Sequence, residues 1–381
     1  MKLVIVGTGY VGLVSGACFA EFGYKTICVD KDKDRIEKLN SGKCPFYEPG
    51  MDDLLSKHLK NTKLLTFSPS LKESMIDADI VFITVGTPSR RLEDEADLSF
   101  VWTVADEISQ NINSYCVVVT KSTVPVGTSK EIKKIINKKI AKDKFDIVSN
   151  PEFLREGSAI DDFMRPDRVV VGVESERAKE LMLEVYKPLY LRDFPIMFTS
   201  LESAETIKYA SNAFLATKIT FINEIAQLCE NSGADIKEVS KGMGLDERIG
   251  NKFLHAGPGY GGSCFPKDTK ALVETGKEFK SEMELTKTVI KVNENIKKRM
   301  VNKIVSSLED SVKDKKITIL GVTFKANTDD MRESSSLVLI PFLLKKGAIV
   351  KYHDPSGSKK EFKNNKKLKF ERNLSQACKG A

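Results

Sequence analysis

The sequence has no long apolar run, no cluster of histidines and no regular spacing of cysteines. No apolar stretch approaches the ~20 residues that a membrane-spanning helix needs, so we expect no membrane partner. The histidines, at positions 58, 255 and 353, lack ligand-like spacing, and the seven cysteines are odd in number and scattered. We therefore expect no metal site and no disulfide framework. The N-terminus enters a strand pattern at once, without a cleavage site, which predicts a cytoplasmic protein.

The positive charges of the chain are not gathered in one arm. Lysine and arginine together number 60, and aspartate and glutamate 53, which gives a net charge of +7. Since the positive residues are mostly interleaved with acids along amphipathic segments, we expect no nucleic-acid partner. A modest positive balance instead suits anionic small molecules such as nucleotides.

Length and hydrophobic patterning predict the fold class. At ~150 residues per domain, a chain of 381 residues corresponds to roughly two or three domains. Short apolar runs rich in Val and Ile alternate with segments of helical periodicity, which predicts a parallel sheet covered by helices. Strands are expected at 2–7, 26–29, 80–85, 116–120, 147–149 and 169–173.

The middle of the chain is predicted to be helical. Helical periodicity begins at Thr199, where Thr199 and Glu202 fit a capping box, and runs almost unbroken to Gly233. A second helical stretch covers about 282–308. Strand patterns then return at 316–322, 349–352 and 368–370. We therefore predict an α/β protein in which a long helical middle domain joins two Rossmann-like, doubly wound domains.

These patterns divide the chain into three expected domains, at residues 1–198, 199–310 and 311–381. The last of them contains only three strand candidates, whereas open sheets of this kind have about five or six strands. Too few strands are then present to cover the apolar helix expected around 334–346. We therefore expect the third domain to be truncated at its C-terminal end.

A glycine pattern directly after the first strand predicts a dinucleotide site. Gly7, Gly9 and Gly12 form G-x-G-x-x-G between a strand and a helical pattern. Such glycines permit a tight turn, close approach of the backbone to a pyrophosphate, and close packing of helix on strand. Asp30 ends the next strand and would bind a ribose diol while repelling a 2′-phosphate, which favours NAD over NADP. Arg35 is either a further contact to the adenosine ribose or part of a solvated helix face.

One cysteine lies where a structural cysteine is not expected. Cys264 belongs to the glycine-rich segment 257–268, beside Lys267, whereas structural cysteines usually lie among apolar neighbours. A nearby ammonium raises the thiolate fraction that a nucleophile requires. Beside an NAD site, such a thiol fits the oxidation of an aldehyde through a thiohemiacetal and a thioester. A cysteine hydrolase that pairs Cys264 with His255 is disfavoured, because it has no use for a dinucleotide fold.

The long helix carries a polar stripe in a segment that is otherwise largely apolar. At 100° per residue, the four polar side chains of this stripe lie within about 60° of one another around the helix axis. They are Glu205, Lys208, Asn212 and Asn223. The stripe is either a solvated face or a set of catalytic side chains.

Ordered motifs along residues 1 to about 355 resemble the UDP-glucose/GDP-mannose dehydrogenase family. Besides the glycine pattern and the Cys264 segment, they occur at 47–50, 85–88, 121–127, 150–157, 205–209, 321–325 and 329–334. The segment 257–264 has the sequence Gly-Pro-Gly-Tyr-Gly-Gly-Ser-Cys. This sequence resembles the branch of the family that acts on UDP-glucose more than the branches that act on GDP-mannose or UDP-N-acetylmannosamine.

The resemblance implies a two-step, NAD-dependent oxidation of UDP-glucose to UDP-glucuronate, in which Cys264 captures the aldehyde. It further implies a homodimer and domains that bind NAD, mediate dimerisation and bind UDP, in that order. Three alternatives stay open. They are the same chemistry on UDP-N-acetylmannosamine or GDP-mannose, a single-step NAD dehydrogenase, and a non-catalytic nucleotide-sugar binder.

The resemblance also implies roles for individual residues. The implied catalytic residues are Cys264, Lys208, Asp268, Asn212, Thr123 and Glu156. Among them, Lys208 and Asn212 would hold the sugar hydroxyls and the developing oxyanion. Asp268 would be a general base paired with Lys208, while Thr123 and Glu156 would position the hydrolytic water. The implied NAD-binding residues are Gly7, Gly9, Tyr10, Val11, Gly12, Asp30, Arg35, Gly86, Thr87, Thr123, Glu156, Lys267 and Arg332. The implied substrate-binding residues are Glu152, Phe153, Leu154, Arg155, Glu156, Lys208, Asn212, Arg248, Phe253, Leu254, His255, Ala256, Gly257, Gly261 and Lys325.

Two of these substrate contacts are specified further by the resemblance. Lys325 would meet the diphosphate from the third domain. Arg248 would reach the substrate of a neighbouring subunit.

Overall fold

The computed structural model describes residues 1–88, 95–363 and 367–381. They form two compact units, an N-terminal unit, Met1–Tyr209, and a C-terminal unit, Ala210–Ala381. The helix α10 (Leu201–Ser232) begins in the first unit, and most of its length belongs to the second. Each unit is described below by itself.

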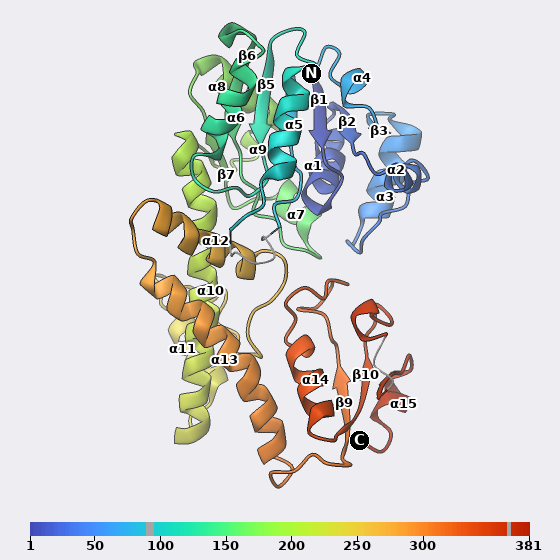
Figure 1. Ribbon diagram of the computed structural model, residues 1–381, viewed down its shortest axis with the longest axis vertical. Helices are drawn as coiled ribbons and strands as arrows, with labels where there is room; N and C mark the ends of the chain where they lie inside the picture. Colours follow the sequence, from blue (N-terminus) through green and yellow to red (C-terminus); the bar gives the residue numbers. More distant parts are fainter. Residues whose placement is uncertain (89–94, 364–366) are drawn as a thin grey trace. The chain divides into compact units, whose positions relative to one another are not determined.

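The N-terminal unit contains an eight-stranded sheet in the order β3-β2-β1-β4-β5-β6-β7-β8 (Figure 1). Neighbouring strands are parallel except for the pair β6–β7. The order of the first six strands is that of a doubly wound dinucleotide-binding sheet. The strands are β1 (Lys2–Val6), β2 (Lys25–Val29), β3 (Leu65–Ser68), β4 (Ile80–Ile83), β5 (Cys116–Thr120), β6 (Phe145–Ser149), β7 (Val169–Gly172) and β8 (Ile196–Thr199).

Both faces of this sheet are buried. In β1, Leu3 and Ile5 belong to one apolar core, while Val4 and Val6 belong to the core on the opposite face. A strand buried on both faces needs apolar residues at every position, which is why the strand sequences are continuous apolar runs. The helices of the unit are α1 (Tyr10–Glu21), α2 (Lys33–Asn40), α3 (Met51–Ser56), α4 (Leu71–Ser74), α5 (Ser99–Ser109), α6 (Thr128–Asn137), α7 (Ala159–Met164), α8 (Glu176–Val185) and α9 (Lys187–Tyr190).

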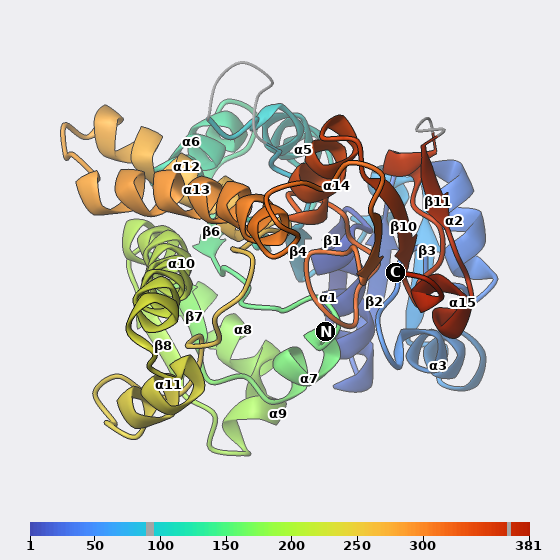
Figure 2. The ribbon, with the colours of Figure 1, turned by 90° about the horizontal axis from the view of Figure 1, so that it is seen from below.

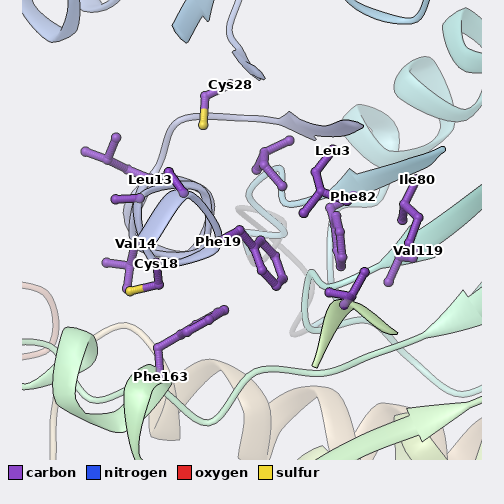
Figure 3. Packing of buried hydrophobic residues seen from close by; sticks show 14 of the residues in the cluster. Leu3, Leu13, Val14, Cys18, Phe19, Cys28, Ile80, Phe82, Val119 and Phe163 are labelled. Carbon is purple, nitrogen blue, oxygen red and sulfur yellow. The ribbon is translucent and has the colours of Figure 1, made fainter. Parts of the chain in front are cut away.

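Aromatic packing fixes α1 against the sheet (Figure 3). The ring of Phe19 in α1 lies 5.0 Å from that of Phe82 in β4 and 5.1 Å, edge to face, from that of Phe163 in α7. Phe19 and Phe82 are fully buried, and Phe163 is nearly so. Since α1 begins inside the glycine pattern, at Tyr10, this packing also holds the turn between β1 and α1 in place.

The C-terminal unit combines helices with a small parallel sheet in the order β11-β10-β9. The helices α12 and α13 lie side by side (Figure 2). The elements after α10 are α11 (Ile236–Gly244), α12 (Phe265–Glu278), α13 (Glu284–Ser306), β9 (Lys316–Leu320), α14 (Ser336–Lys345), β10 (Ile349–His353), β11 (Leu368–Phe370) and α15 (Leu374–Cys378).

The predicted fold class is confirmed. A Rossmann-like sheet, a helical region and a second, three-stranded parallel sheet follow one another along the chain. The strands β3 and β8 and the helices α11 and α12 were not among the expected elements. Within the described ranges, no helix combines the length and the apolar character that crossing a bilayer requires.

Candidate functional site

Except for Lys208 of α10, the predicted site residues of the N-terminal unit follow the carboxyl ends of strands. Because the strands β1, β2, β4, β5 and β6 are parallel, these ends meet at one edge of the sheet. The segments involved begin after Val6, Val29, Ile83, Thr120 and Ser149. This is the edge at which doubly wound sheets bind nucleotides.

The turn between β1 and α1 has the shape of a pyrophosphate cradle. Gly7 has φ +102°, and a Cβ on Gly12 would lie 1.9 Å from the carbonyl oxygen of Gly7. At Gly9, in contrast, a Cβ would meet nothing within 4 Å, so the space beside this backbone is open. No described side chain caps α1, and its first turn contains no acid. An anion can therefore bind the positive end of the helix dipole, which fits a dinucleotide.

Asp30, directly after β2, lies beside this turn. Its carboxylate accepts hydrogen bonds from the backbone nitrogen of Thr8 (2.8 Å) and the Thr8 hydroxyl (2.7 Å). Burial acts to raise the pKa of Asp30, but the hydrogen bonds from Thr8 and Asp32 outweigh it and lower the pKa. The guanidinium of Arg35 lies 3.5 Å from the same carboxylate. Both predicted ribose contacts are thus neighbours, and Asp30 is ionised at neutral pH.

Tyr10 and Glu48 connect the start of α1 to the segment before α7. The Tyr10 hydroxyl donates to the Glu48 carboxylate and accepts from the Gly157 nitrogen at 2.9 Å. Glu48 also accepts from the nitrogens of Gly157 and Ala159, each at 2.7 Å. Burial and the bond to Glu48 raise the pKa of Tyr10. Sequence reasoning missed Glu48, whose backbone partners lie more than a hundred residues further along the chain.

The segments after β4 and β5 are joined by one hydrogen bond. The hydroxyl of Thr87 donates to the carbonyl oxygen of Thr123 at 2.8 Å. Thr123 is half-buried, and Gly86 is exposed. These three predicted residues therefore lie along the same open edge, next to the turn that holds Gly7.

The segment after β6 brings a carboxylate to the predicted catalytic lysine. Glu152 accepts from the Leu154 nitrogen at 2.5 Å and lies 3.4 Å from the ammonium of Lys208. Glu152 and Lys208 are each at most 6 % exposed. The Lys208 ammonium also lies 5.2 Å from the ring of Phe153. Arg155 is exposed and pairs with Asp162, while Glu156 is half-buried.

The polar stripe of α10 is buried, so the alternative of a solvated face is wrong. Its four residues are each at most 5 % exposed. Glu205 accepts hydrogen bonds from the backbone nitrogens of Gly127 (2.6 Å) and Ser129 (2.8 Å) at the start of α6. Asn223 accepts from the Gly257 nitrogen at 2.7 Å. The two ends of the stripe therefore hold backbone, while Lys208 and Asn212 hold carboxylates.

In the C-terminal unit, Cys264 stands at the start of α12. It is the residue preceding the first helical turn, and Asp268 follows one turn later on the same face. The carboxylate of Asp268 accepts from the Asn212 amide and pairs with the Lys267 ammonium, both at 2.6 Å. Asp268 is 1 % exposed. Asp268 and Lys208 belong to different units, and their predicted pairing stays a prediction.

The glycines of the Cys264 segment are required by close packing. A Cβ on Gly261 would lie 2.3 Å from the carbonyl oxygen of Glu333, and one on Gly262 would lie 2.7 Å from the ring of Phe324. The Gly262 nitrogen donates to the Arg332 carbonyl at 2.8 Å. The Cys264 segment is thereby fixed to the segment that carries Lys325 and Arg332.

Asn293 of α13 is a second anchor of the Cys264 segment, and sequence reasoning missed it. Its side chain accepts from the Tyr260 nitrogen at 2.8 Å and donates to the Tyr260 carbonyl at 3.1 Å. Asn293 is 2 % exposed, so this bidentate pairing satisfies a buried amide. An asparagine in an amphipathic helix gives no local signal for such a role.

The remaining predicted substrate residues have diverse environments. Phe253 has φ +65°, and its ring lies 6.1 Å from that of Phe265. Leu254 is buried, whereas His255 and Ala256 are exposed. The Arg248 side chain is 89 % exposed and pairs with Asp246.

In the segment after β9, the side chains of Lys325 and Arg332, both predicted to bind ligands, contact residues that are close to them in sequence. The ammonium of Lys325 lies 5.6 Å from the ring of Phe324. Arg332 pairs with Asp330 at 2.7 Å. Both side chains can therefore be reached by an anion without disturbing a buried core.

Three other cysteines are unsuited to nucleophilic chemistry. Burial raises the pKa of Cys18, Cys28 and Cys116, the last to about 12. Cys264 instead is half-buried and lies at a helix N-terminus, where the helix dipole favours an anionic sulfur. In the described part of the chain, no group of His, Cys, Asp and Glu side chains is arranged to hold a metal ion.

The doubly wound sheet, the glycine turn and the Asp30 carboxylate define an NAD-binding dehydrogenase class. Comparison with known families narrows it further. The chain belongs to the UDP-glucose/GDP-mannose dehydrogenase family. The family's NAD binding domain matches residues 1–190, its central domain residues 202–295 and its UDP binding domain residues 318–381.

Individual relatives agree with this membership. The chain is 52% identical to the UDP-glucose 6-dehydrogenase of Rhizobium meliloti, over 94% of the chain and 82% of the relative. It is 48% identical to the UDP-glucose 6-dehydrogenase TuaD of Bacillus subtilis, over 93% of the chain and 76% of the relative. A solved UDP-glucose dehydrogenase from Pyrobaculum islandicum superposes with a TM-score of 0.93, at 38% identity, covering 99% of this chain and 87% of that one.

Proposed function

We propose that the protein oxidises UDP-glucose to UDP-glucuronate with NAD, in two successive oxidations at carbon 6 of the sugar. NAD, when bound, accepts one hydride in each of the two steps. The observation that carries this proposal is Cys264, a half-buried cysteine at a helix N-terminus in a chain with a dinucleotide turn. High identity to UDP-glucose 6-dehydrogenases over most of the chain supports UDP-glucose as the sugar nucleotide.

The chemistry balances with Cys264 as a covalent carrier. The alcohol first loses a hydride and a proton to give an aldehyde. The Cys264 sulfur then adds to the aldehyde carbon, the carbonyl oxygen takes up a proton, and a thiohemiacetal forms. Loss of a second hydride and a proton gives a thioester, and water cleaves its C–S bond to release the carboxylate and the thiol. One alcohol, one water and two NAD thus yield one carboxylate, two NADH and three protons.

Each step is assigned to side chains that the fold holds in defined places. Asp268 is the general base, and its two oxygens are oriented by Asn212 and Lys267. Lys208 and Asn212 hold the sugar hydroxyls and stabilise the oxyanion that forms at carbon 6. Thr123 and Glu156 position the hydrolytic water. These roles follow from the family resemblance, and the burial of Lys208, Asn212 and Asp268 supports them.

The binding residues divide between the two units. In the N-terminal unit, the glycine turn and Asp30 bind NAD, and residues 152–156 line the sugar nucleotide. In the C-terminal unit, residues 253–257 and Gly261 contact the sugar nucleotide through backbone groups, and Lys325 binds the diphosphate. Arg332 and Lys267 contribute to the NAD site. The three-domain division at 198 and 310 is proposed on the same basis.

The decisive experiment measures NADH formed per UDP-glucose consumed by the purified protein. The proposal requires two NADH per sugar and the release of UDP-glucuronate. One NADH per sugar identifies a single-step dehydrogenase, and binding of UDP-glucose without NADH identifies a nucleotide-sugar binder. Parallel assays with GDP-mannose and UDP-N-acetylmannosamine decide the sugar nucleotide, since the proposal requires kcat/KM to be highest for UDP-glucose.

A homodimer in the cytoplasm completes the proposal. The helix α10 exposes large apolar side chains at intervals of seven residues, Phe214, Phe221 and Leu228. Seven residues bring the helix back to nearly the same face, so the three form one apolar stripe. A stripe of this kind is stabilised by burial against a second copy.

A further inference from the structure

Lys121, directly after β5, is a buried lysine to which the proposed chemistry gives no role. It is 4 % exposed. Its ammonium donates to the side-chain oxygen of Asn150 and to the hydroxyl of Tyr186, both at 3.1 Å. It also lies 5.7 Å and 5.8 Å from the ring centroids of Phe163 and Tyr186. Among the described residues, its hydrogen-bond partners are neutral, and no acid lies within ion-pair distance.

The Lys121 ammonium bonds the start of the segment that contains the predicted substrate-lining residues. Asn150, its partner, is fully buried and also donates to the Val170 carbonyl at 2.8 Å. Residues 150–156, which we call the substrate segment, begin at this asparagine and include Glu152, the partner of Lys208. Lys121 therefore holds the first residue of the segment that carries Glu152.

The charged groups around Lys121 come from several elements. Glu152 and Lys208 interact with its charge. Asp162 of α7 and Arg168 before β7 line the same cavity of about 40 Å³, where Asp162 pairs with Arg155 and Arg168 lies over the Phe153 ring. Burial lowers the pKa of Lys121 to about 8, although Glu152 works to raise it. The lysine is thus mainly charged at neutral pH and loses its charge in mildly alkaline solution.

A role in stability does not explain this lysine. Taking an ammonium out of water without an ion partner disfavours folding. A methionine in its place would orphan no buried group, because the Tyr186 hydroxyl still donates to Asn150 at 2.6 Å and Asn150 still bonds Val170. The ammonium instead restricts the positions of side chains, since it bonds both Asn150 and Tyr186 and attracts the Glu152 carboxylate.

We propose that Lys121 is a positioning residue for the substrate segment: its buried ammonium anchors Asn150 and Tyr186 and draws Glu152 to the place where it orients Lys208. This inference rests on the proposed function in one respect, the identity of the ligand that the segment meets. The anchoring itself concerns the protein alone.

The test compares K121M with K133M. Both substitutions remove one positive charge from the N-terminal unit, but Lys133 lies on α6, where it pairs with Glu174 at the surface. Y186F is a second variant, because it removes one partner of the ammonium and keeps the ring. For each variant, hydrogen exchange of residues 150–157 and denaturant unfolding are measured. The KM values for UDP-glucose and NAD are also measured, and the KM for UDP-glucose is followed as a function of pH.

The expected result is local and pH-dependent. K121M keeps or gains stability at pH 7, exchanges 150–157 faster, and raises the KM for UDP-glucose by about tenfold or more, since small misplacement of binding groups is costly. The KM for NAD stays unchanged. In the parent the KM for UDP-glucose rises as the pH passes through about 8, and K121M lacks this transition. Y186F shows a weaker effect in the same direction, and K133M shows none.

Two outcomes overturn the inference. In the first, K121M keeps the parental exchange rates, KM and pH profile. In the second, K121M loses stability and exchanges faster throughout the unit, which makes Lys121 an ordinary structural residue. If the parent does not oxidise UDP-glucose, the proposed function fails. The exchange and unfolding measurements then still decide whether Lys121 anchors the segment.

Discussion

At the scale of single residues, Cys264 carries the strongest prediction. Replacing it with serine should abolish the second oxidation, because a hydroxyl is a far weaker nucleophile than a thiol near neutral pH. UDP-glucose binding should remain nearly intact. Single-turnover product analysis and calorimetric binding of UDP-glucose measure the two effects. A serine variant that forms UDP-glucuronate at the parental rate would remove the covalent mechanism.

Asp30 carries a second prediction at this scale. Asp30→Ala should narrow the preference for NAD over NADP, because the lost carboxylate no longer repels a 2′-phosphate. The same substitution removes two hydrogen bonds to Thr8, so kcat/KM for NAD should fall as well. Thr8→Val, which removes only the hydroxyl bond, serves as the control for damage to the turn. An unchanged ratio of kcat/KM for NAD and NADP in Asp30→Ala would show that Asp30 does not meet the ribose.

The sequence predicted those residues whose role depends on their immediate neighbours in the chain. The glycine turn is an example, because Gly7, Gly9 and Gly12 lie within six residues. Lys121 and Glu48 could not be found in this way, since each acts on partners that are distant in sequence, such as Asn150 and Gly157. Their residue types are ordinary, and only folding makes them neighbours.

At the scale of secondary structure elements, the errors have local physical causes. Strand β8 (Ile196–Thr199) was missed because it is at the edge of its sheet and only partly buried, which leaves a weak apolar pattern. The start of α10 was placed one residue early. Ser200 accepts a hydrogen bond from the Ser203 nitrogen, while Thr199 is the last residue of β8. A sequence with several candidate caps in a row does not specify which one is used.

Glu205 provides the prediction at this scale. Its carboxylate accepts two backbone hydrogen bonds at the start of α6, so Glu205→Gln, which offers only one oxygen, leaves a buried N–H without a partner. The free energy of unfolding should fall by about 1–3 kcal/mol. Glu202→Gln is the matched control, because Glu202 pairs with Lys130 at the surface and such pairs contribute about 0–1 kcal/mol. Equal effects of the two substitutions in denaturant unfolding would contradict this assignment.

The pH dependence of the Glu205 contribution has a defined sign. Burial raises the pKa of Glu205 despite its hydrogen bonds to Ser129 and Gly127. The folded state therefore binds a proton more readily than the unfolded state, and stability from this group falls as the pH rises from the unfolded pKa to the folded pKa. The difference in unfolding free energy between parent and Glu205→Gln should accordingly shrink as the pH rises through this window. A difference that grows would show that the carboxylate is favoured over its protonated form.

At the scale of the whole molecule, the order of the three regions was readable from the sequence because each has its own periodicity. Alternating strand and helix patterns mark the first and last regions, and a helical pattern more than thirty residues long marks the middle. The contacts inside these regions were not readable, because they depend on side chains such as Asn293 that carry no periodic signal.

Assembly is the last prediction, and it belongs to the whole molecule. If the stripe of Phe214, Phe221 and Leu228 is covered by a second copy of the chain, a charge at its centre must be buried on association and is strongly unfavourable. Phe221→Asp should therefore give monomers in light scattering at micromolar concentration, where the parent gives dimers. Phe279→Asp tests whether any exposed aromatic has this effect, because Phe279 is 57 % exposed but lies at the end of α12. If both variants remain dimeric while the parent is a dimer, the stripe on α10 is not the interface.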